Sequence, residues 1–374
     1  MRVLMLSKAL VAGTSQRKLE ELARCPGVEL TLVTPPYWQH DNGTKQMLEK
    51  LYTAGYNMIV TPMARNGNYH LHAYPKLGEI MREVQPEIVH IDEEPFNFAT
   101  FQAMRLACHH KARALFFTWQ NLYRDYPPPF RQMELYNYKR AAAALAGNRE
   151  AVDVLRRKGY KKSVHVIPQF GFDTEIYKRS APRKPRTPGA PFTLGFLGRL
   201  VETKGLVTTV EALTHLPDYC QAVFVGDGSM KSVLEAEAAR LGVSQRVIIR
   251  PGVPTYEAPE ILAAFDVHVL PSRTFPNWKE QFGRTLAESM ACQTPVIGSD
   301  CGEIPYVIGD AGLVFPEGNA PELAARVRQL LDNPQLYTEL AARGRQRILE
   351  NYTQGQIARQ TFEVYQEMME TNRP

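Results

Sequence analysis

Two acidic residues, Glu280 and Glu288, lie eight positions apart in the 374-residue chain and are its most distinctive candidates for chemistry. Carboxylates accept hydrogen bonds from hydroxyl groups, so two of them on one approach to a site suit a sugar. The alternative is that both lie on the solvated edge of a helix, where most glutamates are found. That alternative leaves a second motif, described below, unexplained.

A helix is predicted to begin next to the first glutamate. Phe282, Leu286 and Met290 recur at the spacing of an amphipathic helix, which places Glu280 just outside its first turn. Strands are predicted on both sides of this helix, and ligands of such doubly wound units bind at the carboxyl ends of the strands. The main-chain N–H groups of Phe282, Gly283 and Arg284 would bind anionic or oxygen-rich groups of the ligand, helped by the positive end of the helix dipole.

The second motif follows a predicted buried strand, Phe192 to Leu197. Gly198 ends this strand, and the cations Arg199 and Lys204 come directly after it. A guanidinium can donate two hydrogen bonds to phosphate oxygens while an ammonium adds a point charge, so the pair could stabilise a departing diphosphate. Surface cations ahead of a helix are the alternative explanation for either residue alone.

These motifs resemble the donor site of the retaining glycosyltransferases of family 4, or glycosyl transferases group 1. The resemblance is specific over Leu194 to Phe315 and only topological over Met1 to Tyr160. It implies the GT-B fold, an α/β architecture in which two Rossmann-like doubly wound domains face each other across a cleft. The residues that carry it are Glu280-x7-Glu288 with Phe282-Gly283 inside it, Glu288 to Cys292, Thr294 to Ile297, and Gly198 to Gly205.

The resemblance implies a retaining hexosyl transfer from a UDP- or GDP-sugar to an acceptor hydroxyl. Glu280 would contact the donor sugar, and Glu288 would accept hydrogen bonds from the ribose. Arg199 and Lys204 would stabilise the leaving diphosphate, whose phosphate would itself help to take the acceptor proton. No metal and no cofactor are expected, because the cations replace a metal as counter-charge. The donor-binding positions implied are Gly13, Gly198, Gly228, Val253, Phe282, Gly283, Arg284 and Glu288.

The chain also departs from the family pattern. No histidine stands near the reacting centre, where Gln120 takes its place, so a catalytic histidine is not implied. Gln293 stands where the family mostly has glycine at a helix end, and a left-handed conformation there would cost about 1 kcal/mol. Glu303 replaces a glycine and Tyr306 a glutamate. Four histidines that could substitute for the missing histidine, His70, His72, His109 and His110, are expected at the surface.

Acceptor groups are predicted at the ends of two strands in the first domain, at Glu93, Glu94, Gln120 and Asn121. A solvated acidic loop explains the run Asp92 to Glu94 equally well, because three adjacent carboxylates repel one another. Trp119 could equally be a core residue. The sequence does not distinguish a lipid, a glycan, a small metabolite or a protein as the acceptor.

The domain organisation is read from composition and periodicity. An acceptor domain is predicted over 1–177, a stiff basic linker over 178–191, a donor domain over 192–353, and a final helix over 354–374. The resemblance implies that this final helix returns to the first domain. Strands and helices alternate in both domains, which indicates parallel sheets covered by helices. One of the predicted helices runs from Arg131 to Leu145, and residues 35–57 have no firm prediction.

Composition favours a cytoplasmic protein. No apolar stretch reaches the roughly 20 residues that a spanning helix needs, and the five cysteines show no disulfide or zinc spacing. A net charge of +5 suits anionic nucleotide sugars or a peripheral contact at the inner face of a membrane, and the basic linker could supply that contact. Nucleic acid is not an expected partner, and the oligomeric state is not readable.

Three other classes of protein share parts of this pattern. A GT-B phosphorylase or a sugar-nucleotide epimerase would have the same architecture. A nicotinamide-dependent dehydrogenase would need the Gly-x-Gly-x-x-Gly fingerprint, which the first strand-to-helix turn lacks. A sugar-nucleotide sensor without activity would keep the cations Arg199 and Lys204.

Overall fold

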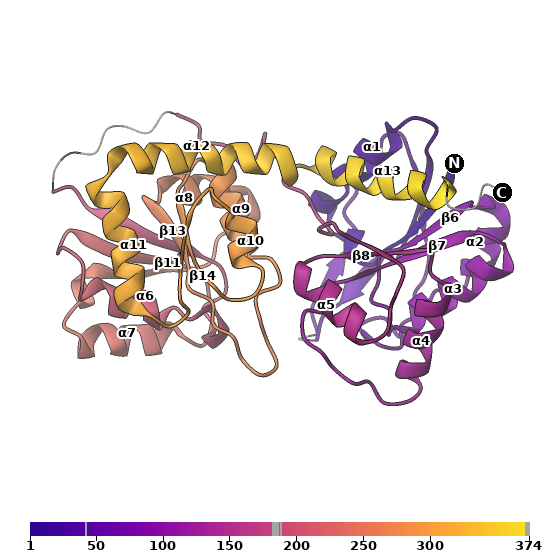
Figure 1. Cartoon of the computed structure of the whole chain (residues 1–374), viewed down its shortest axis with the longest axis horizontal. Coiled ribbons are helices and arrows are strands. Elements are labelled where there is room, and N and C mark those ends of the chain that lie inside the picture. Colours follow the sequence, from indigo (N-terminus) through magenta and orange to yellow (C-terminus); the bar gives the residue numbers. More distant parts are fainter. Residues whose placement is uncertain (42, 182–186, 188, 371–374) are drawn as a thin grey trace. The chain divides into compact units, whose positions relative to one another are not determined.

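The computed structural model describes residues 1–41, 43–181, 187 and 189–370. The chain divides into two compact units, one made of Met1–Gly171 with Gln354–Pro374 and the other of Phe172–Thr353 (Figure 1). Each unit is built on its own parallel sheet, so the predicted α/β class with two Rossmann-like domains is confirmed. Six of the fourteen residues of the predicted linker, including its cations Arg183, Lys184 and Arg186, lie outside the described residues.

The first unit contains a seven-stranded parallel sheet in the order β5-β2-β1-β6-β7-β8-β9. The chain winds outward from β1 in one direction and then from β6 in the other, so the topological switch point lies between these two strands. The strands are β1 Arg2–Leu6, β2 Glu29–Thr34, β5 Asn57–Val60, β6 Ile88–Ile91, β7 Arg113–Thr118, β8 Ala143–Ala146 and β9 Ser163–Val166. A separate antiparallel pair is formed by β3 Tyr37–Gln39 and β4 Lys45–Met47.

Helices cover both faces of this sheet. Along β1, Leu4 and Leu6 pack into a core with α2 to α5, whereas Val3 and Met5 pack with α1 and α13 on the other face. The last helix of the chain therefore completes the core of the first unit. The helices are α1 Arg17–Ala23, α2 Leu77–Val84, α3 Phe98–His109, α4 Phe130–Arg140, α5 Arg149–Arg157 and α13 Gln354–Glu370.

The predicted helix Arg131 to Leu145 is wrong in its second half. α4 ends at Arg140, and the alanine-rich residues that follow form β8, which pairs with β7 and β9. Alanine favours a helix by less than about 1 kcal/mol per residue. All four residues of β8 are buried with a strand on either side, and this pairing outweighs the local preference.

The second unit contains a six-stranded parallel sheet in the order β12-β11-β10-β13-β14-β15, with its switch point between β10 and β13. The strands are β10 Phe192–Leu197, β11 Cys220–Val225, β12 Val247–Arg250, β13 Val267–Leu270, β14 Val296–Ser299 and β15 Leu313–Phe315. The helices are α6 Val207–Leu213, α7 Lys231–Arg240, α8 Ala258–Ala264, α9 Arg284–Ala291, α10 Ile304–Ile308, α11 Ala320–Asp332 and α12 Pro334–Asn351.

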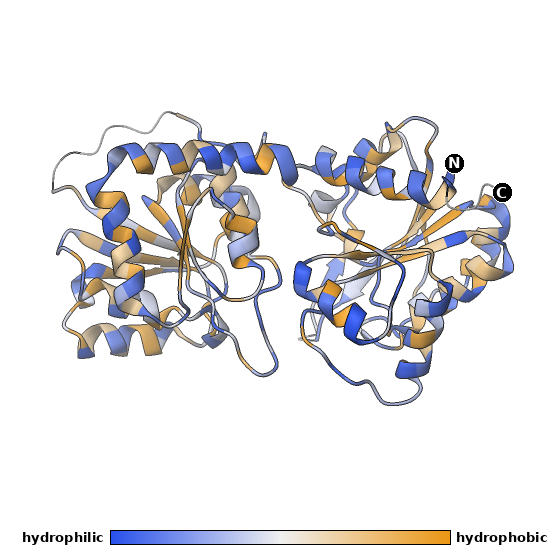
Figure 2. Ribbon diagram, in the orientation of Figure 1, coloured by the Kyte–Doolittle hydropathy of each residue, from blue (hydrophilic) through white to orange (hydrophobic). Residues whose placement is uncertain are grey.

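Hydrophobic residues line the central strands of each sheet, and the covering helices carry hydrophilic residues on their outer sides (Figure 2). α6 packs against α7 and α11, and α9 packs against α8, α10 and α12. None of the described helices is both long and apolar enough to cross a membrane.

Candidate functional site

The loops after β10, β11 and β13 meet at the carboxyl edge of the second sheet. A Cβ atom on Gly228, after β11, would lie 2.2 Å from the carbonyl oxygen of Leu200, after β10. A Cβ atom on Gly205 would lie 2.1 Å from the carbonyl oxygen of Pro271, after β13. Only glycine permits such close approaches, so these two positions bring the three loops together at the switch point.

Lys204 and Glu280 form an ion pair across this switch point. The distance from Lys204 Nζ to Glu280 Oε2 is 2.6 Å, and the Ser272 hydroxyl donates to the same oxygen at 2.9 Å. Lys204 also lies 5.2 Å from the centre of the Trp278 ring. Burial and the charge of Lys204 lower the pKa of His268, in β13, to about 3, so this histidine is neutral. The pair thus joins residues 76 positions apart in the chain.

The loop after β14 holds the main chain of Glu280 in place. The Glu303 N–H group donates to the Glu280 carbonyl oxygen at 3.1 Å. A Cβ atom on Gly302 would lie 2.1 Å from the same oxygen. Contacts from the loops after β10, β13 and β14 therefore fix the position of Glu280.

Arg199 is an exposed cation at the same edge. It is the second residue after β10, and its guanidinium makes no hydrogen bond or ion pair with any residue that the structure describes. Gly198 before it has a positive φ of 147°. The guanidinium of Arg199 could therefore interact with an anion bound at the end of β10.

Glu288 has different partners from Glu280. It lies in α9, where its Oε1 is 2.7 Å from Arg284 Nε and where it also accepts a hydrogen bond from Tyr177. Burial raises the pKa of Glu288, and the contacts with Arg284 and Tyr177 oppose this shift. None of its described contacts is with Lys204 or Glu280.

The start of α9 lies two residues later than predicted. The helix begins at Arg284, and Gly283 caps it with a φ of 81°. The side chain of Phe282 is buried, with its ring centre 6.0 Å from that of Phe172 and 5.5 Å from that of Tyr352. Phe282 is therefore a core side chain, and only its main chain is suited to contact a ligand.

The remaining predicted donor positions differ in exposure. Gly228 is exposed, and Val253, three residues after β12, is half-buried. Next to it, the Gly252 N–H group donates to Asp227 Oδ2 at 3.1 Å, which ties the loop after β12 to the loop after β11. Gly228 and Val253 both lie at the carboxyl edge of the second sheet.

Gly13 belongs to the first unit, where its N–H group donates to Glu49 Oε2 at 2.8 Å. A Cβ atom there would lie 2.6 Å from the Leu51 side chain. The N–H group of Gly13 is thus already bonded, and the packing against Leu51 accounts for the glycine. The idea that this N–H group faces a diphosphate has no support in the structure.

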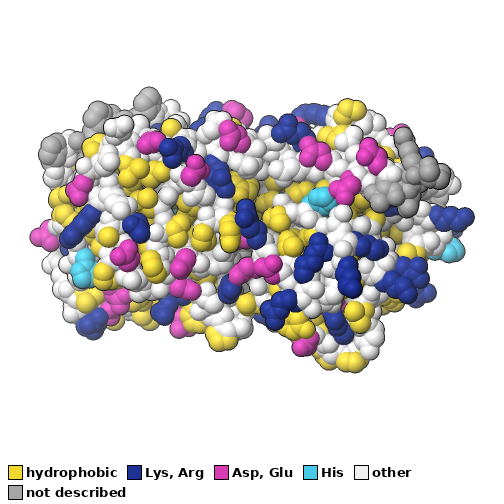
Figure 3. All heavy atoms as spheres, viewed as in Figure 1, with side chains coloured by type: hydrophobic (Ala, Val, Ile, Leu, Met, Phe, Trp, Pro, Cys, Tyr) yellow, Lys and Arg dark blue, Asp and Glu magenta, His cyan; other side chains and the backbone are white. Residues whose placement is uncertain are grey.

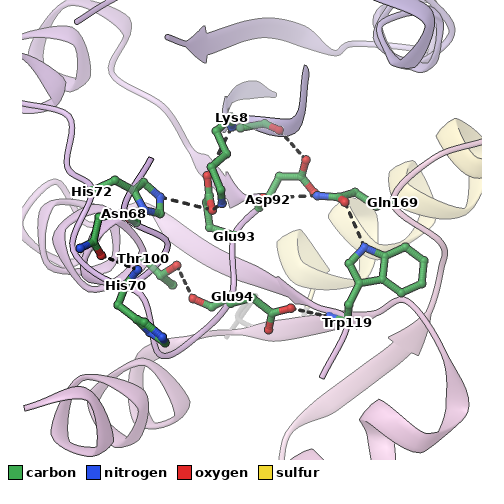
Figure 4. A network of polar contacts seen from close by, with 11 residues as sticks. Lys8, Asn68, His70, His72, Asp92, Glu93, Glu94, Thr100, Trp119 and Gln169 are labelled. Carbon is green, nitrogen blue, oxygen red and sulfur yellow. Dashed lines mark hydrogen bonds and ion pairs between the residues drawn. The ribbon is translucent and has the colours of Figure 1, made fainter. Parts of the chain in front are cut away.

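Three carboxylates at the switch point of the first unit each have their own partner (Figure 4). Asp92 Oδ2 accepts a hydrogen bond from the Ser7 hydroxyl at 2.6 Å. Glu93 forms an ion pair with Lys8. Glu94 accepts one hydrogen bond from the Thr118 hydroxyl at 2.6 Å and another from the Trp119 N–H group at 2.7 Å. The alternative of a solvated acidic loop is therefore wrong.

Glu93 and Glu94 are adjacent but have opposite pKa shifts. Burial alone would raise the pKa of Glu93, yet Lys8 and His72 lower it to about 2. Burial raises the pKa of Glu94 to about 7, because its hydrogen bonds only partly offset the loss of water. Glu93 is thus a fixed negative charge, whereas Glu94 takes up a proton close to neutral pH.

The expectation of surface histidines is wrong for His72, which is completely buried. Its Nδ1 lies 3.0 Å from the Asn68 carbonyl oxygen and its Nε2 lies 3.4 Å from Glu93 Oε2. His72 thus packs against the Glu93 carboxylate inside the first unit. His70 is half-buried among aromatic rings, His110 is half-buried and His109 is exposed.

The other predicted acceptor residues follow β7. Gln120 is half-buried, and Lys158 Nζ donates to its Oε1 at 3.3 Å. Asn121 is buried. Trp119 is half-buried and packs against the core of the first unit. Its Nε1 donates to Gln169 at 3.0 Å, and its ring fills the space that a side chain at Gly147 would need.

Several polar residues of these clusters were not identified from the sequence. Lys8 and Ser272 each follow a buried strand within two residues, and a polar residue in that position is a usable signal. His72 and Tyr177 carry no such signal, because their partners Glu93 and Glu288 are distant in the chain. Among the described residues, no group of three or more His, Cys, Asp or Glu side chains is placed to hold a metal ion.

Two family descriptions match the chain. Residues 178–347 match the family described as Glycosyl transferases group 1, and residues 16–175 match Glycosyltransferase Family 4. Alpha-maltose-1-phosphate synthase of Mycolicibacterium smegmatis is 31% identical over 227 residues, which are 55% of this chain and 57% of that protein. Alpha-D-kanosaminyltransferase of Streptomyces kanamyceticus is 29% identical over 56% of each. The chain thus spans little more than half the length of these relatives.

Solved structures resemble the chain over almost its whole length. Anabaena HepE in complex with UDP has a TM-score of 0.73 at 17% identity and covers 98% of this chain and 100% of its own. A glycosyltransferase from Rickettsia africae has a TM-score of 0.72 at 18% identity, covering 99% of both chains. At such identities the likeness establishes the GT-B fold of two Rossmann-like domains. Since the two family matches together span most of the sequence, the chain belongs to the glycosyltransferases of family 4, the glycosyl transferases group 1.

Proposed function

We propose that the chain transfers a hexosyl group from a nucleoside diphosphate sugar, a UDP- or GDP-sugar, to an acceptor hydroxyl with retention of configuration. The observation that carries the proposal is the ion pair of Lys204 with Glu280 at the switch point of the second sheet, beside the exposed Arg199. Ligands of doubly wound sheets bind at this position. Anabaena HepE, which shares the fold, binds UDP, and this favours uridine as the base.

The donor would lie along the carboxyl edge of the second sheet. Arg199 and Lys204 are suited to the diphosphate because they provide two positive charges after the same strand. Glu280, fixed by Ser272 and by the loop after β14, would accept hydrogen bonds from sugar hydroxyls. Glu288 would accept hydrogen bonds from the ribose, in competition with its present contacts to Arg284 and Tyr177.

The same cations would assist the chemical step. Negative charge develops on the diphosphate as the glycosidic bond breaks, and Arg199 and Lys204 would stabilise it without a metal or cofactor. The acceptor hydroxyl would attack from the face that the diphosphate leaves and pass its proton to the leaving phosphate. This front-face path requires no nucleophilic side chain and yields the retained anomer.

The acceptor side would involve Glu94 rather than Glu93. Glu93 is fully engaged with Lys8 and His72, which gives it a structural role in the first unit. Glu94 is half-buried, and each of its oxygens accepts a single described hydrogen bond, so lone pairs remain for a hydroxyl group. Gln120 and Asn121, at the end of the neighbouring strand, would add further polar contacts.

The proposal is tested by a screen of UDP-, GDP- and ADP-sugars, each with and without a panel of hydroxylated acceptors. Release of nucleoside diphosphate and the anomeric configuration of the product are followed by NMR. We expect one donor to be consumed at a rate that depends on the acceptor, with retention.

Other results would contradict the proposal. Donor conversion without any acceptor would indicate an epimerase, and dependence on inorganic phosphate would indicate a phosphorylase. Tight binding of a nucleoside diphosphate with no turnover on any acceptor would favour a sensor. Binding of NAD in preference to UDP or GDP would indicate a dehydrogenase.

A further inference from the structure

The positive charge of the chain is concentrated in one segment. Residues 135–172 contain eight Lys and Arg side chains and only two acids, Glu150 and Asp153, so the segment is net +6 while the whole chain is net +5. Seven of the eight cations are exposed, and six of these seven follow the middle of α4 or α5. We call these six residues the basic face: Lys139, Arg140, Arg156, Arg157, Lys161 and Lys162.

Contacts within the first unit hold the basic face together. Lys162 Nζ donates to the carbonyl oxygens of Lys139 at 2.9 Å and Ala141 at 2.6 Å, which joins the segment after α5 to the end of α4. Arg156 donates to the carbonyl oxygen of Lys162 at 2.8 Å. In the space-filling view, Lys and Arg side chains gather over α3, α4 and α5 with few acids among them (Figure 3).

Helix ends explain only part of this arrangement. Cations in the last turns of α4 and α5 interact favourably with the helix dipoles, and Lys162 bonds the free carbonyl groups there. Lys161 lies beyond both helices, and no described hydrogen bond or ion pair engages it. Burial, and to a lesser extent the charge of Arg140, lower the pKa of Lys162.

Exposed apolar side chains accompany these cations. Leu135 is 46% exposed and lies one helical turn before Lys139, on the same side of α4. Tyr123 is 38% exposed, and the guanidinium of Arg157 lies 4.6 Å from the centre of its ring. Cations combined with a few exposed apolar and aromatic groups are the composition of helical surfaces that bind the lipid–water interface.

We propose that the basic face docks the protein onto an anionic lipid bilayer. Charge complementarity favours this partner, since each Lys or Arg held near an anionic membrane contributes to binding. The exposed Leu135 and Tyr123 favour a bilayer over a nucleic acid, because an apolar side chain gains nothing from a phosphate backbone. The inference is independent of the proposed function.

The test compares two double variants of the full chain with equal changes in net charge. Lys139→Glu with Lys161→Glu reverses two charges of the basic face. The control is Lys76→Glu with Lys231→Glu, two exposed positions at the starts of α2 and α7, where a glutamate suits the helix dipole. Co-sedimentation is measured with vesicles of phosphatidylcholine alone and of phosphatidylcholine with phosphatidylglycerol. Thermal unfolding checks that both variants are folded.

We expect the parent and the control to bind the vesicles that contain phosphatidylglycerol, and the basic-face variant to bind them at least about tenfold more weakly. Binding should weaken as salt is added, because salt screens exposed charges. Equal binding by the two variants, binding to phosphatidylcholine alone, or tighter binding to a DNA fragment than to the anionic vesicles at the same salt would each overturn the proposal.

Discussion

At the scale of single residues, Lys204 and Glu280 act as one unit, because each neutralises the other at the switch point of the second sheet. We predict that Lys204→Ala weakens nucleoside diphosphate binding at least tenfold and also lowers turnover, since a charged contact to phosphate is worth about 1.5–3 kcal/mol. Glu280→Ala should leave that binding within about threefold of the parent but lower turnover about 100-fold or more. Calorimetry with the diphosphate and steady-state rates check both expectations.

The matched control for this pair is Arg240→Ala, which removes an exposed cation at the far end of α7. It should change neither binding nor turnover. If Arg240→Ala and Lys204→Ala weaken binding equally, only the overall charge matters and Lys204 has no specific role. Unchanged turnover in Glu280→Ala would remove Glu280 from the mechanism.

The adjacent acids Glu93 and Glu94 should respond to pH in opposite ways. The pKa of Glu93 is lowered to about 2, so its stabilising effect is present above its ordinary value of 4.5 and is lost as the pH falls from there. The pKa of Glu94 is raised to about 7, so its ionisation destabilises the fold as the pH rises from 4.5 through 7. Glu93 should therefore protect the fold at neutral pH, and Glu94 should weaken it.

Two glutamine variants test this difference. Glu93→Gln should lower the free energy of unfolding at about pH 7 by about 3 kcal/mol, because Lys8 and His72 lose their counter-charge. Glu94→Gln should raise it by about 1 kcal/mol at about pH 8 and leave it unchanged at about pH 4, with partial burial limiting the gain. Urea unfolding at several pH values measures both, with the exposed Glu257→Gln as control. A Glu94→Gln variant with the parent's pH profile would contradict the assignment.

Sequence reasoning at this scale identified residues whose types and positions follow a strand directly. Arg199 and Glu94 are of this kind, whereas Lys204 and Glu280 lie farther into the loops after β10 and β13 and were identified by the family motif. The structure places all four at carboxyl edges of sheets. It did not identify Tyr177 or His72, because their partners are brought to them by tertiary packing alone. For the same reason the hydrogen bond from the Gly13 N–H group to Glu49 is seen only in the structure.

At the scale of elements, the close approach of the loops after β10 and β13 depends on Gly205. A Cβ atom there would meet the Pro271 carbonyl oxygen, and the residue has a φ of 61°. We predict that Gly205→Ala lowers the free energy of unfolding by about 3 kcal/mol, from the left-handed conformation and the steric overlap together. Gly242→Ala is the control, because φ is 72° there but no atom lies within 4 Å of the added Cβ.

The control should lose only about 1 kcal/mol, the cost of the backbone conformation alone. Chemical unfolding of both variants gives the comparison, and nucleoside diphosphate binding should weaken only in Gly205→Ala. Equal losses of stability in the two variants would show that the contact between the loops contributes nothing.

Elements with a clear hydrophobic period were predictable, and elements without one were not. The central strands of both sheets and helix α9 follow from buried apolar runs and from the spacing of Phe282, Leu286 and Met290. The sequence does not predict the strand β8, because its alanines favour a helix locally and form a strand only through pairing with β7 and β9. Gln293 has the left-handed conformation that its place at the end of α9 suggested, with a φ of 56°.

At the scale of the whole molecule, the last helix of the sequence belongs to the first unit. In α13, Tyr365 is completely buried, and its hydroxyl oxygen lies 2.7 Å from His90 Nδ1 in β6. We predict that Tyr365→Ala lowers the free energy of unfolding of the first unit by about 4 kcal/mol, because it leaves a cavity and an unpaired histidine nitrogen. The half-buried Phe362→Ala should cost less than half as much.

Hydrogen exchange measures this effect separately in each unit. Protection should fall in β1, β6 and α1, with β10 and β13 of the second unit unchanged. A uniform loss of protection across both units would contradict the assignment of α13 to the first core.

The two-domain α/β class was predictable because strands and helices alternate along the chain. The return of α13 to the first unit was suggested only by family resemblance, since its apolar face does not specify which core it completes.

The most direct test of the central claim is calorimetric titration of the full chain with UDP, GDP, ADP and NAD. We expect one nucleoside diphosphate to bind in preference to NAD, with its affinity reduced at least tenfold by Lys204→Ala and unchanged by Arg240→Ala. If no nucleoside diphosphate binds, or if Lys204→Ala binds as tightly as the parent, the carboxyl edge of the second sheet is not the donor site.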